Sequence, residues 1–516
     1  MRNNRFKNSM LNLVTGLFGR ALTILLNFVV RTIFIHCLNE AYLSVNGLYS
    51  NILTVLSLAE LGFGSAMVYR MYAPVAEHDS RKTAELLNFY RYVYHIVGFV
   101  ILCVGICVIP FLDVIIKDKP DVPNLTLYYV VFLLNTVSSY WFVSYKGAVF
   151  SADQKDYLKT CIHNIIAIIQ SVIQIILLLA FGQYLFYLLV QVCGNIFANI
   201  YIAHLTDKQY PDVVACKDAH LNSEEKKQLM RDTGALFLTR LGHVVLNGTD
   251  NIIISAVVGV LWVGRLSNYT LICDSVTSVL CQITAAITGS LGNYFATENR
   301  ESGYSIFKKI EFLNFWLYGF SFIALLILLD PFVRLWAGEK FVLGLPVCFA
   351  IALNFFVAGY MNTLWVFRST LGLFKQGKYR PLIVAGLNIV LSIALGKICG
   401  VFGILFATFL SRAAVNLWYD PIILHKYGFG VSAKPFFCEY VKRTLLVALI
   451  AILLLAVRKF IFVSGVTIHG FIIMTAVTAI VPNAVFWIVY HKRGEYLYFK
   501  DVLKNRIVVP LVKKLH

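Results

Sequence analysis

The chain has 516 residues, of which 59% are hydrophobic and 14% are charged, and its formal net charge is +18. Its mean hydropathy is +0.73. Soluble globular domains carry roughly 25% charged residues, so this composition excludes an ordinary soluble core. Apolar segments of about 20 residues recur throughout, and each is long enough to cross a hydrocarbon layer of about 30 Å. Because backbone groups must be satisfied inside lipid, these segments predict a bundle of helices.

In chain order, the apolar segments predict an all-α, polytopic membrane protein with about fourteen transmembrane helices. The predicted spans are residues 10–36, 43–74, 90–112, 127–150, 158–181, 184–206, 233–261, 265–297, 309–330, 341–372, 381–400, 401–424, 438–457 and 469–490. The first span is not expected to be a signal peptide, because it is too long, contains two arginines and lacks a small-residue cleavage site after it.

The first span carries a polar face. The stretch GRALTILLNFVVRTIFIH contains Arg20, Asn27 and Arg31, which follow one another at steps of seven and four residues. These steps place all three side chains on one side of an α-helix. Charged groups inside membrane helices are costly and usually face a bundle interior or a water-filled cavity. The pattern therefore predicts that this helix lines a hydrated cavity.

The basic residues outside the spans are distributed unevenly. Alternate loops, together with both ends of the chain, hold most of the lysines and arginines, which predicts that these segments are cytoplasmic. The other loops hold Lys117, Lys119, Arg265, Arg334, Lys340, Arg458 and Lys459. This asymmetry accounts for most of the basicity, so we expect no nucleic-acid partner.

Two halves of the chain resemble each other at a nearly constant offset. The pairs are Arg20 with Arg240, Asn27 with Asn247, Tyr49 with Tyr269, Trp141 with Trp365, and Asn164 with Asn388. Six spans separate the copies, so both copies have the same orientation, as in a parallel repeat. We expect an N-terminal six-helix lobe at 1–206, a polar cytoplasmic linker at 207–232, a second six-helix lobe at 233–424, and a helix pair with a basic tail at 425–516.

The duplication suggests that both lobes contribute to one cationic cavity. Within the spans, basic residues outnumber acidic ones, and arginine suits bidentate binding of phosphate. The predicted substrate-binding residues are Arg20, Asn27, Arg31, Arg70, Lys146, Arg240, Asn247, Arg368 and Arg412. For Arg70, Lys146 and Arg368, and also for Arg91, which all lie near cytoplasmic helix ends, snorkelling to a headgroup or pairing with a carboxylate is an equally open alternative.

The acidic residues deep in the spans are few. Glu60, Asp250 and Asp274 are candidates for coupling to a proton or Na⁺, or else fixed counter-ions of the arginines. The 11 cysteines are scattered without zinc-ligand spacing, so we expect no metal site. No phosphate-binding P-loop is present, so we expect no ATP and no other cofactor.

The segment from Asn46 to Tyr94, NGLYSNILTVLSLAELGFGSAMVYRMYAPVAEHDSRKTAELLNFYRYVY, resembles the second and third helices of polysaccharide-transporter-type (Wzx-type) oligosaccharide flippases. These belong to the multidrug/oligosaccharidyl-lipid/polysaccharide exporter superfamily. The resemblance implies a non-enzymatic flippase of the bacterial inner membrane. Its substrate would be an undecaprenyl-diphosphate-linked oligosaccharide, moved by alternating access. The implied partners are the lipid bilayer, a polysaccharide polymerase and glycosyltransferases.

Three other functions remain open at this point. A flippase of the peptidoglycan precursor shares the helix count and a cationic cavity. A cation-coupled multidrug exporter shares the fold, but it usually has twelve helices and a carboxylate in the first. A membrane glycosyltransferase or polymerase should show a large loop with acidic catalytic residues, and the longest loop predicted here is the linker at 207–232.

Overall fold

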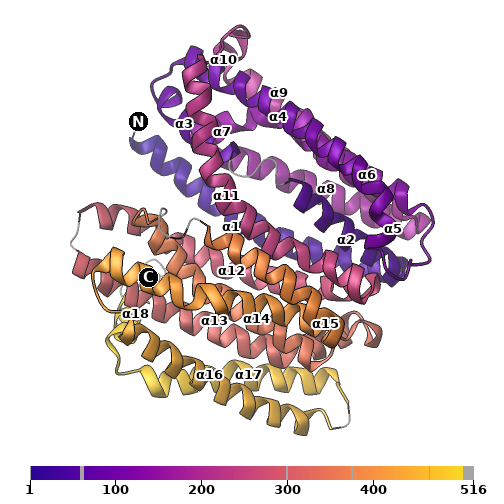
Figure 1. Ribbon diagram of the computed structural model, residues 1–516, viewed down its shortest axis with the longest axis vertical. Coiled ribbons are helices and arrows are strands. Elements are labelled where there is room, and N and C mark those ends of the chain that lie inside the picture. The colour runs from indigo at the N-terminus through magenta and orange to yellow at the C-terminus, as the bar shows by residue number, and fades with distance from the viewer. Residues whose placement is uncertain are drawn as a thin grey trace, which may run out of the picture. The chain divides into compact units, whose positions relative to one another are not determined.

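The computed structural model describes residues 2–57, 63–297, 300–373, 377, 379–463 and 465–503, and every regular element in these ranges is helical. Each predicted span coincides over most of its length with one or two of the helices (Figure 1). The all-α, polytopic membrane fold is therefore confirmed. Apolar stretches of this length become helices because a helix satisfies its own backbone groups within the segment.

Within the described residues, nine helices are long and apolar enough to cross a membrane, or ten if one bent pair counts as a single span. In that pair, Leu125–Trp141 and Ser144–Ala152 meet at an angle of 52°. The long helix Arg380–Ile423 contains two predicted spans, separated by a kink at Gly400 with φ of 60° and ψ of −140°. Glycine adopts a positive φ without steric cost, so it marks the boundary between the two spans.

The chain forms two units, which are described separately. Unit 1 comprises Met1–Ser267 with Pro381–Gly400, and unit 2 comprises Asn268–Arg380 with Val401–His516. These units reflect spatial compactness, whereas the predicted lobes at 1–206 and 233–424 reflect duplication. The lobe boundaries therefore stay a prediction.

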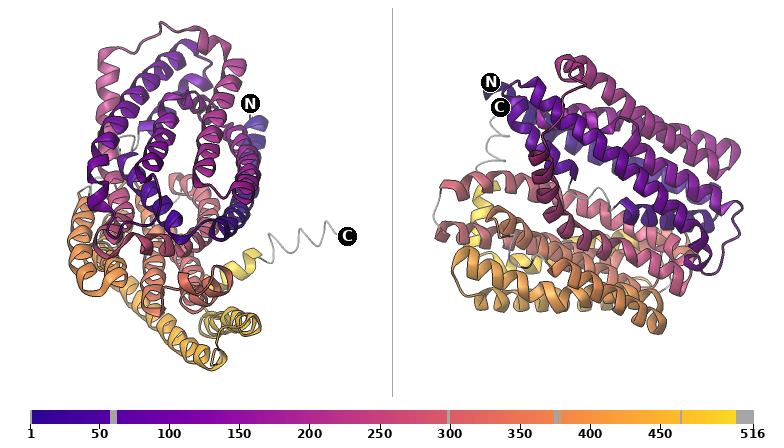
Figure 2. Two further views of the ribbon diagram at one scale, coloured as in Figure 1. Left: turned by 90° about the vertical axis from the view of Figure 1, so that its right-hand side faces the viewer. Right: turned by 45° about the horizontal axis from the view of Figure 1, so that its top comes forward.

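Unit 1 contains the helices of the first half of the chain. Their bounds are α1 Arg2–Cys37, α2 Glu40–Leu56, α3 Phe63–Ala76, α4 Ser80–Val108, η2 Ile109–Phe111, α5 Leu112–Ile115, α6 Leu125–Trp141, η3 Ser144–Gly147, α7 Ala148–Ala152, α8 Asp156–Phe181, α9 Tyr184–Gln209, α10 Pro211–Ala215, α11 Ser223–Ile253 and η4 Ile254–Val258. Helix α1 packs along α8, α8 packs beside α9, and α2 packs against α11, as can be followed in Figure 1 and Figure 2.

Local signals in the sequence set several helix ends in unit 1. Asn39 accepts hydrogen bonds from the backbone N–H groups of Ala41 and Tyr42 at the start of α2. Asp79 accepts one from the N–H of Lys82 at the start of α4. Such caps satisfy donors that have no partner within the helix. At the other end of a helix, Gly182 stops α8 in the left-handed conformation, with φ of 60°.

The predicted linker at 207–232 is more helical than its polar composition suggested. Helix α9 extends to Gln209, α10 follows it, and α11 begins at Ser223, so that only residues 216–222 separate α10 from α11. Asn222 caps α11 by accepting a hydrogen bond from the N–H of Glu225. Acidic residues in the first helical turn also interact favourably with the helix dipole, which explains the early start of α11.

Unit 2 contains the remaining helices, apart from residues 260–267 of α12 and Pro381–Gly400 of α15, which belong to unit 1. The bounds are α12 Val260–Thr297, α13 Arg300–Trp336, η5 Glu339–Phe341, α14 Leu345–Thr370, α15 Arg380–Ile423, η6 Leu424–Phe429, α16 Lys434–Ile461, α17 Ile468–Tyr490 and α18 Gly494–Leu503. The final pair, α16 and α17, packs against α13. A buried ion pair between Arg443 and Glu311 joins α16 to α13, and Trp316 donates a 2.8 Å hydrogen bond to Asn483 of α17.

One predicted pair of duplicated residues has matching environments in the two units. Tyr49 and Tyr269 are both fully buried. The Tyr49 hydroxyl donates to the carbonyl of Leu125, the first residue of α6, at 3.1 Å. The Tyr269 hydroxyl donates to Asp330 at 2.5 Å and accepts from the N–H of Leu343, just before α14, at 3.0 Å. Each tyrosine hydroxyl thus bonds a backbone group at or just before the start of a later helix.

Candidate functional site

The polar face of α1 includes two side chains that stay outside the packing of unit 1. Arg20 and Asn27 are exposed, although the helix around them is long and apolar. Next to them, Gly19 is buried against α8, where a Cβ atom would lie 2.2 Å from Nδ2 of Asn164. Close contact at Gly19 therefore holds one side of α1 on α8, and Arg20 projects away from that contact.

Arg31 lies about three turns beyond Arg20 on α1 and is half-buried. Its guanidinium donates a 3.0 Å hydrogen bond to Oγ of Ser267. Tyr184 and Tyr187 lie close to it, and both of their rings contact Phe34 edge-on. Within the part of the chain that the structure describes, Arg31 forms no ion pair with a carboxylate.

The tyrosines beside Arg31 belong to a larger aromatic cluster. Tyr184 contacts the rings of Tyr42 and Tyr128. Its hydroxyl donates to the amide oxygen of Asn46 at 3.1 Å. The cluster joins α1, α2, α6 and α9 near one end of each helix, and so it fixes the backbone from which Arg31 projects.

Lys146, another predicted site residue, is held by a carboxylate. Its ammonium lies 2.5 Å from Oδ1 and 2.7 Å from Oδ2 of Asp207, on α9. Arg70, on α3, is half-buried. The ion pair with Asp207 favours the alternative that Lys146 is a counter-ion over the prediction that it binds the substrate.

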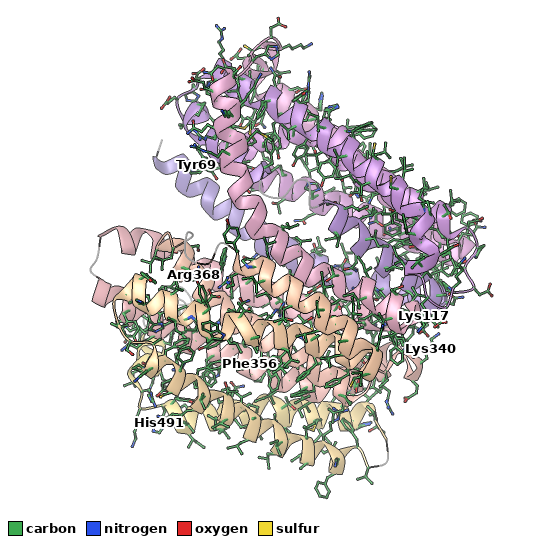
Figure 3. All side chains as sticks on the ribbon, in the orientation of Figure 1. Tyr69, Lys117, Lys340, Phe356, Arg368 and His491 are labelled. Carbon is green, nitrogen blue, oxygen red and sulfur yellow. The ribbon has the colours of Figure 1, made fainter. Side chains whose placement is uncertain are left out.

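Arg368 in unit 2, labelled in Figure 3, is also paired. It is buried at the end of α14 and forms an ion pair with Asp420, which also pairs with Arg380. Arg368 donates a second hydrogen bond to the carbonyl of Leu373, at 3.1 Å. Arg412 is half-buried and donates to the carbonyl of Asn354 at 3.3 Å.

The remaining predicted residues are less well defined. Glu60 lies outside the described residues. Arg240 and Asn247 lie on α11, where the structure describes the backbone but not these side chains. Asp250 is half-buried on α11, and Asp274 is exposed on α12.

Unit 1 also contains a cavity of about 650 Å³. Its lining includes Tyr69 and Tyr72 of α3, together with His163 of α8 and Asn199 of α9. Tyr69 is 73% exposed and meets Tyr72 edge-on (Figure 3 labels Tyr69). Exposed tyrosine rings beside polar groups can stack on sugar rings while the polar groups bind their hydroxyls.

The structure thus separates two pairs of the predicted cations. Lys146 and Arg368 already bind carboxylates. Arg20 and Arg31 form no ion pair with any described residue. A guanidinium has five donors in a planar fork, which suits the oxygen atoms of a phosphate. Sequence reasoning missed Ser267, Asp207 and Asp420 as partners, because they are distant along the chain and carry no local signal.

No family model matches the sequence, and no curated protein matches it. Solved structures do match: the neighbours are transporters of the MOP superfamily. The lipid II flippase MurJ in its inward closed conformation has a TM-score of 0.62 at 14% identity, with 93% of this chain and 99% of that chain covered. An inward-facing multidrug resistance MATE family transporter has a TM-score of 0.59 at 13% identity, with 79% and 97% covered.

A third neighbour is a MOP superfamily transporter from Pyrococcus furiosus Vc1. The reverse polarity of its binding pocket suggests a different function for that protein. Its TM-score is 0.53 at 14% identity, with 80% of this chain and 95% of that chain covered. At these identities the likeness shows a shared fold. The substrate has to be argued from the residues of this chain.

Proposed function

We propose that this chain is a flippase that moves an undecaprenyl-diphosphate-linked oligosaccharide from the cytoplasmic to the outer leaflet by alternating access, for synthesis of a cell-surface polysaccharide. The observation that carries the proposal concerns Arg20 and Arg31. Both lie on an apolar helix, and neither forms an ion pair with a carboxylate among the described residues. Charged groups at such positions are expensive, and they mark substrate or ion pathways.

The diphosphate is the part of the substrate that this helix would bind. Arg20 and Arg31 would donate to its oxygens, and Asn27 would add a neutral hydrogen bond. By the duplication, Arg240 and Asn247 would act in the same way from α11. Arg70 and Arg412 would lie along the path. We assign Lys146 and Arg368 to structural ion pairs, since their carboxylate partners already neutralise them.

A second candidate is a flippase of the peptidoglycan lipid precursor. The observation in its favour is coverage: the lipid II flippase aligns with 93% of this chain, whereas the MATE transporter aligns with 79%. The same observation disfavours a multidrug exporter, and α1 has arginines instead of the acid expected in such an exporter. A glycosyltransferase or polymerase lacks support, since only the short segment at 216–222 separates α10 from α11.

For energy coupling, we propose Asp250, Asp274 and Glu60 as candidates. If one of them carries the coupling ion, its amide replacement should remove the pH or Na⁺ dependence of transport. Reduced activity with unchanged ion dependence would instead identify that carboxylate as a counter-ion. We further propose that the protein lies in the bacterial inner membrane with both ends of the chain in the cytoplasm.

The function is tested by reconstituting the full chain in liposomes. Three labelled substrates are compared: an undecaprenyl-diphosphate-linked oligosaccharide, lipid II, and a lipophilic cationic drug. We expect the first to be moved fastest. Faster movement of lipid II would favour the second candidate, and transport of the drug alone would overturn both flippase assignments.

A further inference from the structure

A second cavity of about 660 Å³ lies in unit 1, at the end that the positive-inside rule predicts to be cytoplasmic. Its walls come from α4, from the bend after α6, and from residues 217–221 of the linker. Pockets that bind small ligands typically measure about 300–1,000 Å³. The α1 face described above is not part of its lining, so this cavity calls for its own explanation.

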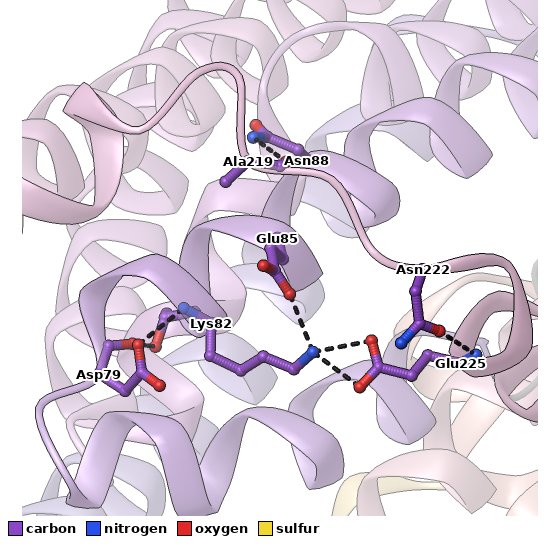
Figure 4. A network of polar contacts seen from close by, with 8 residues as sticks. Asp79, Lys82, Glu85, Asn88, Ala219, Asn222 and Glu225 are labelled. Carbon is purple, nitrogen blue, oxygen red and sulfur yellow. Dashed lines mark hydrogen bonds and ion pairs between the residues drawn. The ribbon is translucent and has the colours of Figure 1, made fainter.

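The linker wall of this cavity is tied to α4 at one amide (Figure 4). Nδ2 of Asn88 lies 3.1 Å from the carbonyl oxygen of Cys216, 3.2 Å from that of Lys217 and 3.0 Å from that of Ala219. Ala219 and Leu221 are buried. The linker therefore has a defined path beside α4, and the residues that it contributes to the cavity have defined positions.

An ion-pair cluster fixes the next part of the wall (Figure 4). The ammonium of Lys82 lies 2.8 Å from Glu85 of α4 and 2.7 Å from Glu225 of α11. Glu85 is the one acidic residue among the described residues that line the cavity. Arg91, Lys217 and Lys226 also line the cavity, so the lining carries more positive than negative charge.

Three cations with no carboxylate partner in the described chain surround the open space. They are Arg91 of α4, Lys217 of the linker and Lys226 of α11, and all three are exposed. Two aromatic side chains, Tyr92 and Trp141, also line the cavity and are exposed. Cations beside exposed rings match the two parts of a sugar diphosphate, since the phosphates bind the cations and the sugar stacks on the rings.

We infer that this cavity binds the sugar-diphosphate headgroup of the lipid-linked substrate on the cytoplasmic side, before the headgroup reaches the α1 face. The inference rests on the proposed function for the lipid-linked source of the headgroup. The recognition itself rests on Arg91, Lys217, Lys226 and the two aromatic side chains. The linker then acts as a part of the substrate pathway as well as a connection between helices.

Lysine footprinting of the unmodified full chain in detergent tests the site. An amine-reactive acetylating reagent is applied with pyrophosphate or with chloride at equal ionic strength, and the labelled peptides are quantified by mass spectrometry. At pyrophosphate about ten times its Kd, labelling of Lys217 and Lys226 should fall about tenfold. The adjacent Lys227 and the exposed Lys208 do not line the cavity and should be labelled at an unchanged rate. Equal labelling of all four lysines would overturn the site.

Two further ligands distinguish the sources of the headgroup. A short-chain prenyl-diphosphate disaccharide should protect Lys217 and Lys226 at lower concentration than pyrophosphate. A soluble nucleoside-diphosphate sugar should protect them less well than the prenyl compound does. Stronger protection by the nucleoside-diphosphate sugar would overturn the assignment to the lipid-linked substrate.

A double variant links the cavity to transport. K217A/K226A should weaken binding of the prenyl compound about tenfold or more, because each lysine donates a charge-assisted hydrogen bond. The matched control K208A/K227A removes the same charge from the same side and should bind normally. If R20A flips at the wild-type rate while K217A/K226A still loses binding, the proposed function fails and the cavity site stands. If R20A stops flipping while K217A/K226A binds normally, the cavity inference fails alone.

Discussion

Arg31 and Ser267, which are 236 positions apart in the chain, are joined by a 3.0 Å hydrogen bond from the guanidinium to the hydroxyl. This bond uses one of the five donors of the arginine. Tyrosine rings lie beside the group, and no described carboxylate pairs with it. The serine therefore orients the guanidinium without neutralising it, and the remaining donors can bind an anion.

Variants of Arg31 and Ser267 distinguish the orienting of the guanidinium by the serine from the binding of the substrate by the guanidinium. Arg31→Lys should reduce flipping strongly, because a point charge replaces a planar fork. Ser267→Ala should reduce it mildly, since it removes one hydrogen bond worth about 0.5–1.5 kcal/mol. Initial flipping rates of both single variants and the double variant form a thermodynamic cycle. Equal, large losses of flipping rate in both single variants would contradict direct binding by Arg31. They would show that its contribution lies in the hydrogen bond to Ser267.

The cluster of Asp420 with Arg368 and Arg380 should govern stability. Asp420→Asn leaves the buried Arg368 and the half-buried Arg380 without their shared carboxylate, and breaking a buried pair costs about 3–5 kcal/mol. The melting temperature in detergent should fall clearly. Glu224→Gln, at an exposed site on α11, is the control and should melt like the wild type. Normal melting of Asp420→Asn with loss of flipping would instead place Arg368 in the substrate pathway.

Two glycines three residues apart on α1 should respond differently to valine. At Gly19, a Cβ atom would overlap with the Asn164 side chain, whereas at Gly16 it would meet nothing within 4 Å. Gly19→Val should therefore destabilise the protein by about 1–3 kcal/mol and lower the flipping rate by displacing α1. Gly16→Val should melt close to the wild type. Identical melting curves would contradict the packing of α1 on α8.

The tether between Asn88 and the linker should protect the linker from proteases. Asn88→Ala removes a donor that binds backbone carbonyls, at a cost of about 1–3 kcal/mol for two hydrogen bonds. Cleavage by trypsin after Lys217 should become faster, because loops released from their contacts are preferred sites of nicking. Gln209→Ala, at the end of α9, serves as the control. An unchanged cleavage rate in Asn88→Ala would show that buried residues such as Leu221 hold the linker without the amide.

Much of the fold was predictable because its signals are local. Apolar runs predicted the helices, and the boundary predicted between the spans 381–400 and 401–424 is the kink at Gly400. The early start of α11 also had a local signal, the cap at Asn222 followed by Glu224 and Glu225. The polar composition of this stretch outweighed that signal and led to the prediction of a linker.

The partners of the charged residues were not predictable in the same way. Lys146 binds Asp207 and Arg368 binds Asp420 across 61 and 52 positions of the chain. Such pairs depend on which helices lie side by side, and periodicity within a single helix does not report that. Periodicity did place Arg20, Asn27 and Arg31 on one face of α1. It could not reveal that Ser267 lies beside Arg31 while Arg20 stays unpaired within the described chain.

The flipping rate of Arg20→Ala in proteoliposomes, with a labelled undecaprenyl-diphosphate-linked oligosaccharide, tests the cationic face of α1 most directly. Removing the charge lowers the cost of inserting α1 by about 2.5–3.5 kcal/mol, so the variant should be as abundant in the membrane as the wild type. We expect the rate to fall about tenfold or more, with a milder loss for Asn27→Ala and partial recovery in Arg20→Lys. A wild-type rate in the Arg20→Ala, Arg240→Ala double variant would contradict this expectation.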